Sequence, residues 1–312
     1  MNTSSSKIIL CIGSIYVETN YLELETGGKD ELAGGKEYQS ASWEMRPAGS
    51  AVNVATQLVA LGCKVKLIGK RGRDEMGQKL CSLLEGRGVD SSHLVVSKEV
   101  QTSVDTGVVF KHNGNNIQLV SGGANGSLCY SDIINQSLDL DNVGAVYLGG
   151  MAKQHALITD YPKLISFFNE KGIKVFLDHG RIPVDFSEEK RQLILTSIGL
   201  VDGYFPNEEE ICAVTKTNRL TEAVGRIMEI GVKLVIVKQG GNGCTVATPN
   251  KIVHIPGRKV EVLNTVGAGD AFNAGFISEY QGGKSPEDSA RFANATAAKR
   301  VGSKKYFIGL NL

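Results

Sequence analysis

Four consecutive residues near the end of the chain, Gly267, Ala268, Gly269 and Asp270, combine a tight turn with a carboxylate. Small residues leave their backbone N–H groups unshielded. The apolar positions that follow have the spacing of a helix that begins at this turn; they are Ala271, Phe272, Ala274, Phe276 and Ile277. The first turn of a helix offers unpaired N–H donors at the positive end of the helix dipole. The turn therefore predicts a site for a phosphate group or a developing oxyanion.

Asp270 makes this turn a candidate for catalysis. A carboxylate would repel a bound phosphate if it served only to cap the helix. It makes chemical sense as a general base, which removes a proton from a hydroxyl group while the adjacent amides hold the phosphoryl group that the hydroxyl attacks. The alternative is an ordinary small-residue turn in which Asp270 only caps backbone N–H groups.

Two longer stretches of the sequence resemble the signatures of one enzyme family. Residues 264–276, which read Asn-Thr-Val-Gly-Ala-Gly-Asp-Ala-Phe-Asn-Ala-Gly-Phe, resemble the second signature of the PfkB family of carbohydrate kinases, the ribokinase-like enzymes. Residues 48–55, followed by Gly62 and Gly72, resemble its first signature. The resemblance implies a kinase that transfers the γ-phosphate of ATP to a hydroxyl group of a small sugar or sugar-like molecule. Asp270 would be its general base and residues 267–269 its anion hole.

The resemblance also implies which residues bind ATP and Mg²⁺. Asn207 and Glu210 match the pair that places Mg²⁺ and the nucleotide phosphates in these kinases, and Mg²⁺ needs only one or two protein carboxylates, often through water. Read alone, the run Pro-Asn-Glu-Glu-Glu is a helix start with acidic residues in its first turn. The other residues matched to ATP binding are Lys238, Gly240, Gly243, Thr265 and Asn294.

On the substrate side, the resemblance places the sugar at the end of the first strand, beneath a lid. Tyr16 and Glu18 stand where ribokinases usually carry Asn and Asp, so the identity of the sugar stays open. Glu18 would bind a differently placed hydroxyl group, and Tyr16 offers an aromatic face to a sugar or a base. Arg181 would bind an anionic group of the substrate, or pair with Asp178 on the surface. The other residues matched to substrate binding are Gly49 and Asn53.

Two departures from the family concern potassium. Asn264 stands where ribokinases usually have an Asp that helps to bind K⁺, and residues 300–303 look shorter than the family's cation loop. A neutral amide provides a weaker field than a carboxylate at the same distance, so the sequence argues against activation by K⁺. Asn264 can still accept the backbone hydrogen bonds that shape the turn.

Short β-rich runs alternate with helical patterns, which predicts one α/β domain over residues 1–312 with a mostly parallel central sheet flanked by helices. The resemblance implies that this domain has the three-layer ribokinase-like fold. The predicted strands are 7–12, 65–68, 145–148, 173–177, 203–205 and 234–237, and the predicted helices are 51–61, 76–85, 161–170, 220–230, 268–280 and 286–301. Segments at about 16–45 and 102–120 break the alternation, and the second contains two strands joined by a turn at 112–116. We expect both segments to form one small β-sheet, which in ribokinase-like enzymes is a lid over the sugar.

Composition argues against several classes of function. The 312 residues include 34 basic and 33 acidic ones, so no nucleic-acid partner is expected. No apolar run approaches the roughly 20 residues of a membrane span, and the first residues lack the basic segment of a signal peptide. A cytoplasmic location without membrane contact is the expectation. The six cysteines are scattered without a CxxC pair, which favours reduced thiols over disulfides or a zinc site.

Three interpretations of the activity stand at this point. The first is a sugar kinase, and the second is a nucleoside kinase on the same scaffold in which Tyr16 stacks on the base. The third is a kinase-fold binding protein without catalysis, against which Asp270 and its glycine turn argue. Exposed edges of the small sheet would let two copies pair, so a homodimer through the lid is a further expectation.

Overall fold

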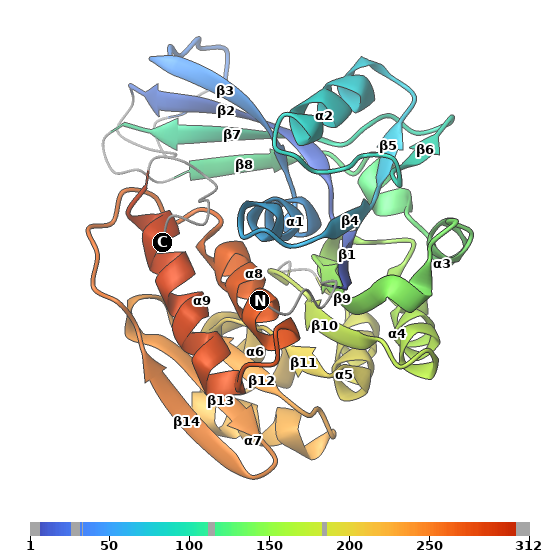
Figure 1. The fold of residues 1–312 in the computed structure, drawn as a ribbon. Helices are drawn as coiled ribbons and strands as arrows, with labels where there is room; N and C mark the ends of the chain where they lie inside the picture. Colours follow the sequence, from blue (N-terminus) through green and yellow to red (C-terminus); the bar gives the residue numbers. More distant parts are fainter. Residues whose placement is uncertain (1–6, 26–31, 33, 112–115, 183–185, 304–312) are drawn as a thin grey trace.

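The computed structural model describes residues 7–25, 32, 34–111, 116–182 and 186–303. Its largest element is an eight-stranded sheet (Figure 1). In order across the sheet the strands are β14 (Lys251–Pro256), β13 (Gly243–Thr248), β12 (Val235–Lys238), β11 (Gly203–Tyr204), β10 (Lys174–Asp178), β9 (Val143–Gly149), β1 (Ile8–Gly13) and β4 (Val65–Ile68). The strands from β12 to β4 are parallel, and β13 and β14 form an antiparallel hairpin at one edge. The predicted mostly parallel sheet is confirmed.

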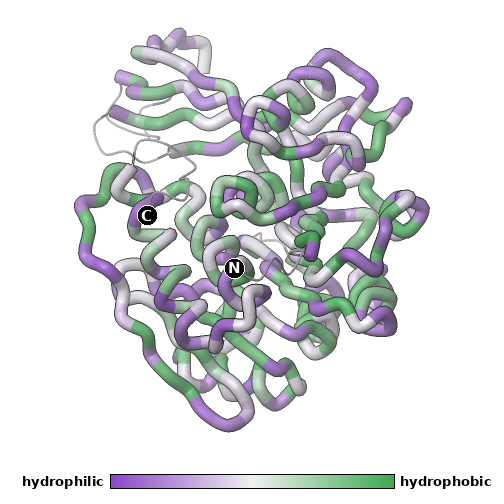
Figure 2. The backbone as a smooth tube through the Cα atoms, in the orientation of Figure 1, coloured by the Kyte–Doolittle hydropathy of each residue, from purple (hydrophilic) through white to green (hydrophobic). Residues whose placement is uncertain are grey.

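Helices cover both faces of the sheet, and the alternation along β1 shows why. Leu10 and Ile12 pack into one hydrophobic core, whereas Ile9 and Cys11 pack into the other. The first core also receives α3 (Tyr130–Ile134), α4 (Tyr161–Glu170), α5 (Glu188–Leu200), α6 (Glu208–Thr215) and α7 (Leu220–Glu229). The second receives α1 (Ser50–Ala60), α2 (Glu75–Glu85), α8 (Ala268–Gln281) and α9 (Pro286–Val301). Strands buried on both faces are hydrophobic along most of their length, as Figure 2 shows for the centre of the molecule.

All the strands and helices predicted from the sequence are present, with boundaries that agree to within two residues. The sequence did not predict the hairpin of β13 and β14 or helix α5. The buried residues of α5 are only Ile194, Ser197 and Ile198, so its amphipathic pattern is weak. Two short strands, β5 (Lys70–Gly72) and β6 (Val95–Ser97), form a separate pair.

The two segments that broke the alternation form a separate four-stranded sheet, which we call the small sheet. Its order is β3 (Ser42–Ala48), β2 (Tyr16–Leu24), β7 (Val104–Phe110) and β8 (Asn116–Val120), and it lies beyond α1 at one end of the molecule (Figure 1). The expectation of one small sheet is therefore confirmed. Of the turn predicted at 112–116, residues 112–115 lie outside the described part of the chain.

The small sheet has a polar face and an apolar face. Its register places Glu18 beside Arg46 on one neighbouring strand and beside Asp105 on the other, and all three side chains are buried. We call this the inner face. Residues one position along the strands point the other way, and several of these are large, apolar and exposed: Tyr21, Trp43 and Leu119. We call this the outer face. A buried polar face is unusual for a sheet and indicates a polar ligand.

The carboxyl ends of the parallel strands meet at one edge of the large sheet. Gly13, Gly149, Asp178 and Lys238 are the last residues of β1, β9, β10 and β12. Helix α8 reaches the same edge, because the Nδ2 atom of its Asn273 donates a hydrogen bond of 2.7 Å to Asp178. Ligands of open α/β sheets bind at this edge, so the fold brings the predicted catalytic helix to the expected place.

Candidate active site

The turn before α8 has the geometry that the sequence predicts. Gly267 is the N-cap of the helix and adopts a left-handed conformation with a φ of 77°. The Oδ1 atom of Asn264 accepts a hydrogen bond of 2.9 Å from the backbone N–H of Val266, which confirms that Asn264 shapes the turn. A left-handed residue at this point turns the chain so that the following N–H groups face one side of the helix start.

The sequence predicts an anion hole formed by Gly267, Ala268 and Gly269, and the backbone N–H groups of these residues differ in whether they are already hydrogen-bonded. The backbone N–H of Ala268 donates to the carbonyl oxygen of Thr265 at 3.1 Å and is therefore already engaged. Within the described residues, no acceptor is recorded for the backbone N–H groups of Gly267, Gly269 and Asp270. These three groups are the donors that remain for an anion.

The carboxylate of Asp270 is held by two residues of α1. Ser50 Oγ donates to Asp270 Oδ1 at 3.0 Å, and Asn53 Nδ2 donates to Oδ2 at 2.8 Å. The first signature thus meets the second in space. Gly49 makes this possible, because a Cβ atom there would lie 2.1 Å from the carbonyl oxygen of Ser14, in a backbone with a φ of 109°. Gly49 has a structural role whether or not it also contacts a substrate.

The surroundings of Asp270 favour a base. Shielding from water and the negative charge of nearby Asp178 raise the pKa of Asp270 to about 6. The hydrogen bonds from Asn53 and Ser50 and the charge of Lys238 act in the opposite direction and limit this rise. A base with a pKa near 6 is ionised at neutral pH and accepts a proton more readily than an ordinary carboxylate.

A chain of buried and partly buried hydrogen bonds joins Asp270 to Asp178. Since Ser50 donates its proton to Asp270, the hydroxyl of Tyr147, 2.7 Å away, must donate to Ser50 Oγ. Asn273 Nδ2 donates to Tyr147 Oη at 3.3 Å and to Asp178 Oδ2 at 2.7 Å. Burial, followed by the charges of Asp178 and Asp270, raises the pKa of Tyr147 well above its usual value, so the phenol stays protonated. The donors point toward the two carboxylates.

At the far end of this chain, Lys238 forms an ion pair with Asp178, with 2.8 Å between Nζ and Oδ2. Burial alone would raise the pKa of Asp178, but Lys238 holds it below its usual value. Burial would lower the pKa of Lys238, yet Asp178, followed by Glu210, raises it, so the amine stays charged. A Cβ atom on Gly269 would lie 3.6 Å from the amine of Lys238. Lys238 therefore adds a fixed positive charge beside the anion hole.

Asn207 and Glu210 lie next to Lys238 and cap helix α6. Asn207 Oδ1 accepts from the N–H of Glu210 at 2.7 Å, and Glu210 Oε2 accepts from the N–H of Asn207 at 2.8 Å. The helix-start interpretation is correct for both residues. Among the described residues no group of three His, Cys, Asp or Glu could hold a metal ion. One carboxylate beside the phosphate site nonetheless fits Mg²⁺, which keeps most of its waters.

The remaining predicted ATP residues differ in their surroundings. Gly240 has a φ of 56°, and no atom of the described residues would lie within 4 Å of a Cβ atom added there, so the space beside it is open. Gly243 is required by the hairpin, because a Cβ there would lie 2.1 Å from the carbonyl oxygen of Ile255. Asn294 is buried, and its Nδ2 donates to the carbonyl oxygens of Ile255 and Pro256, both at 3.2 Å. Its contact with ATP, like that of Thr265, stays a prediction.

Glu18 and Arg181 were predicted to bind the substrate, and the structure shows what surrounds each side chain. Glu18 Oε1 accepts from Gln118 at 2.6 Å, and Oε2 accepts from Asn20 at 3.2 Å and pairs with Arg46. Both carboxylate oxygens are thus engaged within the small sheet. Arg181 is exposed, and its alternative pairing with Asp178 is wrong, because Asp178 is buried and pairs with Lys238.

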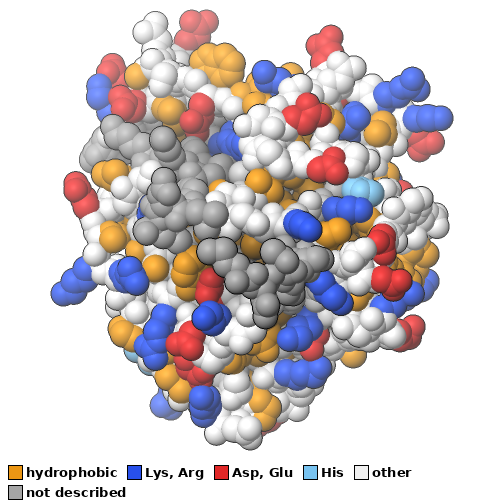
Figure 3. Space-filling view, viewed as in Figure 1, with side chains coloured by type: hydrophobic (Ala, Val, Ile, Leu, Met, Phe, Trp, Pro, Cys, Tyr) orange, Lys and Arg blue, Asp and Glu red, His pale blue; other side chains and the backbone are white. Residues whose placement is uncertain are grey.

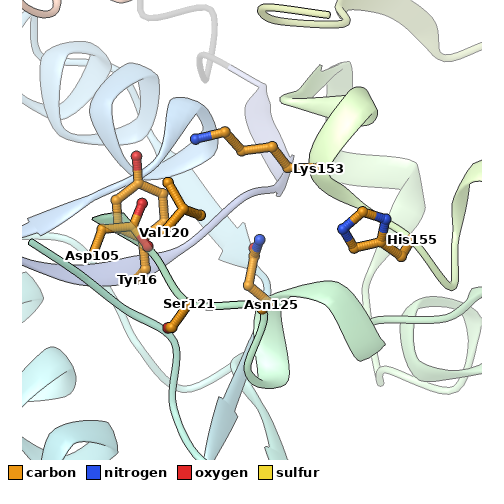
Figure 4. Close-up of a pocket in the computed structure, with 8 residues that line it drawn as sticks. Tyr16, Asp105, Val120, Ser121, Asn125, Lys153 and His155 are labelled. Atoms are coloured by element: carbon orange, nitrogen blue, oxygen red, sulfur yellow. The ribbon is translucent and has the colours of Figure 1, made fainter. Parts of the chain in front are cut away.

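A small pocket lies between the inner face and the carboxyl edge of the large sheet (Figure 4). Tyr16 lines it together with two charged residues that the sequence did not single out, Asp105 and Lys153. Ser50, Tyr147 and Asn273 are further site residues that were missed. Ser50 and Asn273 sit inside the two signature stretches, and that position was the available signal.

Comparison with known proteins agrees with the geometry. Residues 7–306 match the pfkB family of carbohydrate kinases. The chain therefore belongs to this family. A sugar kinase of Archaeoglobus fulgidus is 31% identical over 256 residues, which cover 78% of this chain and 94% of that protein. An ATP-dependent ribose-1-phosphate kinase of Halopiger xanaduensis is 30% identical over 256 residues, 81% of this chain and 80% of that protein.

The fold is shared with solved ribokinase-like structures. A ribokinase II from E. coli, solved with ATP and Mg²⁺, has a TM-score of 0.78 at 23% identity, covering 96% of this chain and 94% of that chain. The protein is thus a sugar kinase with the ribokinase-like fold.

No helix in the described part of the chain is long and apolar enough to cross a membrane. Basic and acidic side chains are interspersed on the face in Figure 3.

The buried ion pair leads to a stability prediction. Replacing Lys238 by Met leaves Asp178 buried without its cation, so the free energy of unfolding should fall by about 3 kcal/mol or more. The double variant Lys238→Met/Asp178→Asn should recover most of that loss. Lys233→Met is the matched control: its ion pair with Asp202 is also 2.8 Å long, but the Lys233 side chain is 77% exposed, so the loss should stay below about 1 kcal/mol. Urea denaturation at pH 7 measures all three, and equal losses for the two single variants would contradict the prediction.

Proposed function

We propose that Asp270 is the general base of this ATP-dependent sugar kinase and that the turn before α8 holds the phosphoryl group in transfer. The observation that carries the proposal is the position of the Asp270 carboxylate, fixed by Ser50 and Asn53 beside backbone N–H groups that have no other acceptor in the described residues. Base and anion hole belong to the same helix turn, so the attacking oxygen and the transferred group would meet there.

The step follows from these positions. Asp270 accepts the proton of an acceptor hydroxyl as its oxygen forms a bond to the γ-phosphorus, and the bond from that phosphorus to the bridging oxygen breaks to release ADP. The N–H groups of Gly267 and Gly269 and the amine of Lys238 stabilise the charge on the γ-phosphoryl oxygens. Mg²⁺ bound with ATP would neutralise phosphate charge, and Asn207 and Glu210 would hold it through water.

Ser50 and Asn53 help to keep the proposed base ionised. Each donates to a different oxygen of Asp270, so both hydrogen bonds favour the ionised form. When the acceptor arrives, Asn53 is placed to exchange one of these bonds for a bond to the sugar. Its Oδ1 atom is buried and has no hydrogen-bond partner among the described residues, which supports that role.

On the acceptor side, the small sheet is proposed as the lid, with Tyr16, Gly49 and Asn53 lining the sugar site. The alternative of a nucleoside that stacks on Tyr16 is not favoured, because the amine of Lys153 already lies 5.5 Å from the centroid of the ring. The alternative of a non-catalytic protein is not favoured either, because the site retains a base of suitable pKa, an anion hole and a fixed cation. Thr265, Gly240 and Asn294 are proposed to lie along ATP.

The test of the base is Asp270→Asn. We expect turnover on the best acceptor to fall by roughly 10²–10⁴, the usual range for a general base, while the affinity for Mg·ATP is retained. ADP release, measured over pentoses, hexoses, ketoses, amino sugars and nucleosides, identifies the acceptor, and calorimetry measures ATP binding. Asp288→Asn, at an exposed carboxylate of α9, is the control and should leave both unchanged. A loss of less than tenfold for Asp270→Asn would exclude it as the base.

The pKa of Asp270 sets the pH dependence. Because the base must be ionised, kcat/KM for the acceptor should fall as the pH decreases through about 6. Ser50→Ala removes a donor to the ionised form, so the pKa should rise and this acidic limb should move upward by on the order of one pH unit. A pH–rate profile of both proteins measures the shift. A limb that stays in place, or moves to lower pH, would be inconsistent with the assignment.

We predict that K⁺ has little effect. Asn264 carries no charge for a monovalent cation, and the fully buried Arg300 lies beside the turn, since a Cβ on Gly267 would be 3.7 Å from Arg300 Nε. A fixed cation is therefore already present beside the turn. Exchanging K⁺ for Na⁺ at constant ionic strength should change the rate by less than about threefold. A tenfold rise on adding K⁺ would show a functional cation site formed by backbone carbonyls.

We also propose that two copies pair through the outer face of the small sheet. Trp43 is 61% exposed and pairs with exposed Tyr21 across β2 and β3, while Leu119 on β8 is 63% exposed. Large exposed apolar side chains at both edges of one sheet face favour a protein interface there. Trp43→Ser should shift sedimentation toward the monomer, whereas Ile252→Ser, at a 64% exposed position of β14, should not. A wild-type monomer at micromolar concentration would contradict this proposal.

A further inference from the structure

Asp105 is a buried acidic residue on the inner face of the small sheet, and its carboxylate lacks hydrogen bonds. It lies on β7 of the small sheet, only 1% of it is exposed, and neither carboxylate oxygen has a hydrogen-bond partner in the part of the chain that the structure describes. Burial raises the pKa of Asp105 to about 6, although the charge of Lys153 and the nearby backbone of Ser121 act in the opposite direction. A buried carboxylate without hydrogen bonds is unfavourable, so its place in a binding pocket calls for a ligand with donors.

Lys153 faces the same pocket from the other side. It ends the short turn Met151–Lys153, which follows β9 at the carboxyl edge, and the backbone of this turn is held by hydrogen bonds to Gly150 and His179. Its amine extends over the ring of Tyr16 (Figure 4). Among the described residues Lys153 forms no ion pair, and the acid in the pocket, Asp105, is not within ion-pair distance of it. The pocket thus contains a separate acid and a separate cation.

Tyr16 connects this pocket with the catalytic carboxylate. Burial, followed by the charges of Asp105, Glu18 and Asp270, raises the pKa of its phenol. Tyr16 lines the pocket together with Asp105. In the register of β2 and β3 it pairs with Ala48, two residues before Ser50, whose hydroxyl donates to the proposed base Asp270. A molecule that occupies the pocket and passes Tyr16 would present its other end to Asp270.

We infer that this pocket binds the part of the acceptor remote from the reacting hydroxyl, with Asp105 accepting hydrogen bonds from acceptor hydroxyls and Lys153 binding a phosphate or carboxylate group. The preferred acceptor is a sugar that already carries a negative charge. The inference rests on the proposed function and specifies its substrate class. Glu18, which the resemblance assigned to the hydroxyls, already has Gln118 on one oxygen and Asn20 and Arg46 on the other, whereas neither oxygen of Asp105 has a hydrogen-bond partner among the described residues. Asp105 therefore has the greater unused capacity to accept hydrogen bonds.

A neutral sugar does not account for this arrangement as well. It would leave the Lys153 amine without a counter-charge in a partly buried site, which is costly. A sugar with a remote anionic group satisfies both charged residues and leaves a hydroxyl free at the other end. A charge-assisted hydrogen bond to a phosphate or carboxylate is also stronger than one to a hydroxyl, so Lys153 would discriminate between the two classes.

The test compares matched acceptors in the ADP-release assay: neutral pentoses and hexoses, the same sugars with a remote phosphate, and the corresponding sugar acids. We expect kcat/KM of the wild type to be at least tenfold higher for one of the anionic classes. Lys153→Met should reduce the ratio of anionic to neutral kcat/KM tenfold or more, mainly through KM of the anionic acceptor, and Lys153→Arg should restore most of it. Lys163→Met is the matched control. Lys163 lies on α4, away from the pocket, and its amine also lies over an aromatic ring, that of Tyr130. The ratio of anionic to neutral kcat/KM should be the same in this variant as in the wild type.

Asp105→Asn provides the second measurement. It removes the charge while keeping the size of a buried side chain, so melting curves should show a folded protein. KM for the acceptor should rise tenfold or more, while KM for Mg·ATP stays within twofold. A preference for neutral sugars or nucleosides, or a ratio that Lys153→Met leaves unchanged, would overturn the inference while the kinase assignment stands. The absence of ADP release with every acceptor would instead count against the proposed function.

Discussion

The site depends on how three charged side chains share the carboxyl edge of the sheet. Asp270 and Asp178 are close enough for each charge to disfavour ionisation of its neighbour, and Lys238 compensates both. Lys238 pairs directly with Asp178, which stays ionised. Burial, followed by the charge of Asp178, then raises the pKa of Asp270. The asymmetry separates the proposed roles: Asp178 holds the Lys238 amine beside the turn that precedes α8, and Asp270 is the proposed base.

Neutral side chains hold the carboxylates of Asp270 and Asp178 in their different surroundings. Toward Asp270, the hydroxyl of Tyr147 on β9 donates to Ser50 on α1, and Ser50 donates to the carboxylate. Toward Asp178, the donor is the side-chain amide of Asn273 on α8. Each element is fixed by a hydrophobic core on a face of the large sheet. The relative position of Asp270, Asp178 and Lys238 is therefore set by the packing of the whole domain, and a loop rearrangement alone would not change it.

The sequence predicted the large sheet, its helices and the turn before α8 because each depends on local pattern: hydrophobic period for the elements and small residues for the turn at 267–269. It predicted less well where the outcome depends on partners distant in the chain. Glu18 was assigned to the substrate from its position, but Arg46 and Gln118 engage it. Ala268 was counted as an anion donor, and its N–H is used by Thr265. Asp105 and Lys153 have no motif, and only the register of the small sheet and the turn after β9 bring them together.

The most direct measurement of the central claim is the titration of the Asp270 carboxyl group itself. Carboxyl carbon NMR of the ligand-free protein, with the Asp270→Asn variant to identify the resonance, gives the pKa without dependence on an acceptor. The arrangement of Asp178, Lys238 and the α1 donors predicts a midpoint of about 6. A midpoint at about 4 or below, the ordinary value of an aspartate, would show that the site does not tune Asp270 as a base and would contradict the account.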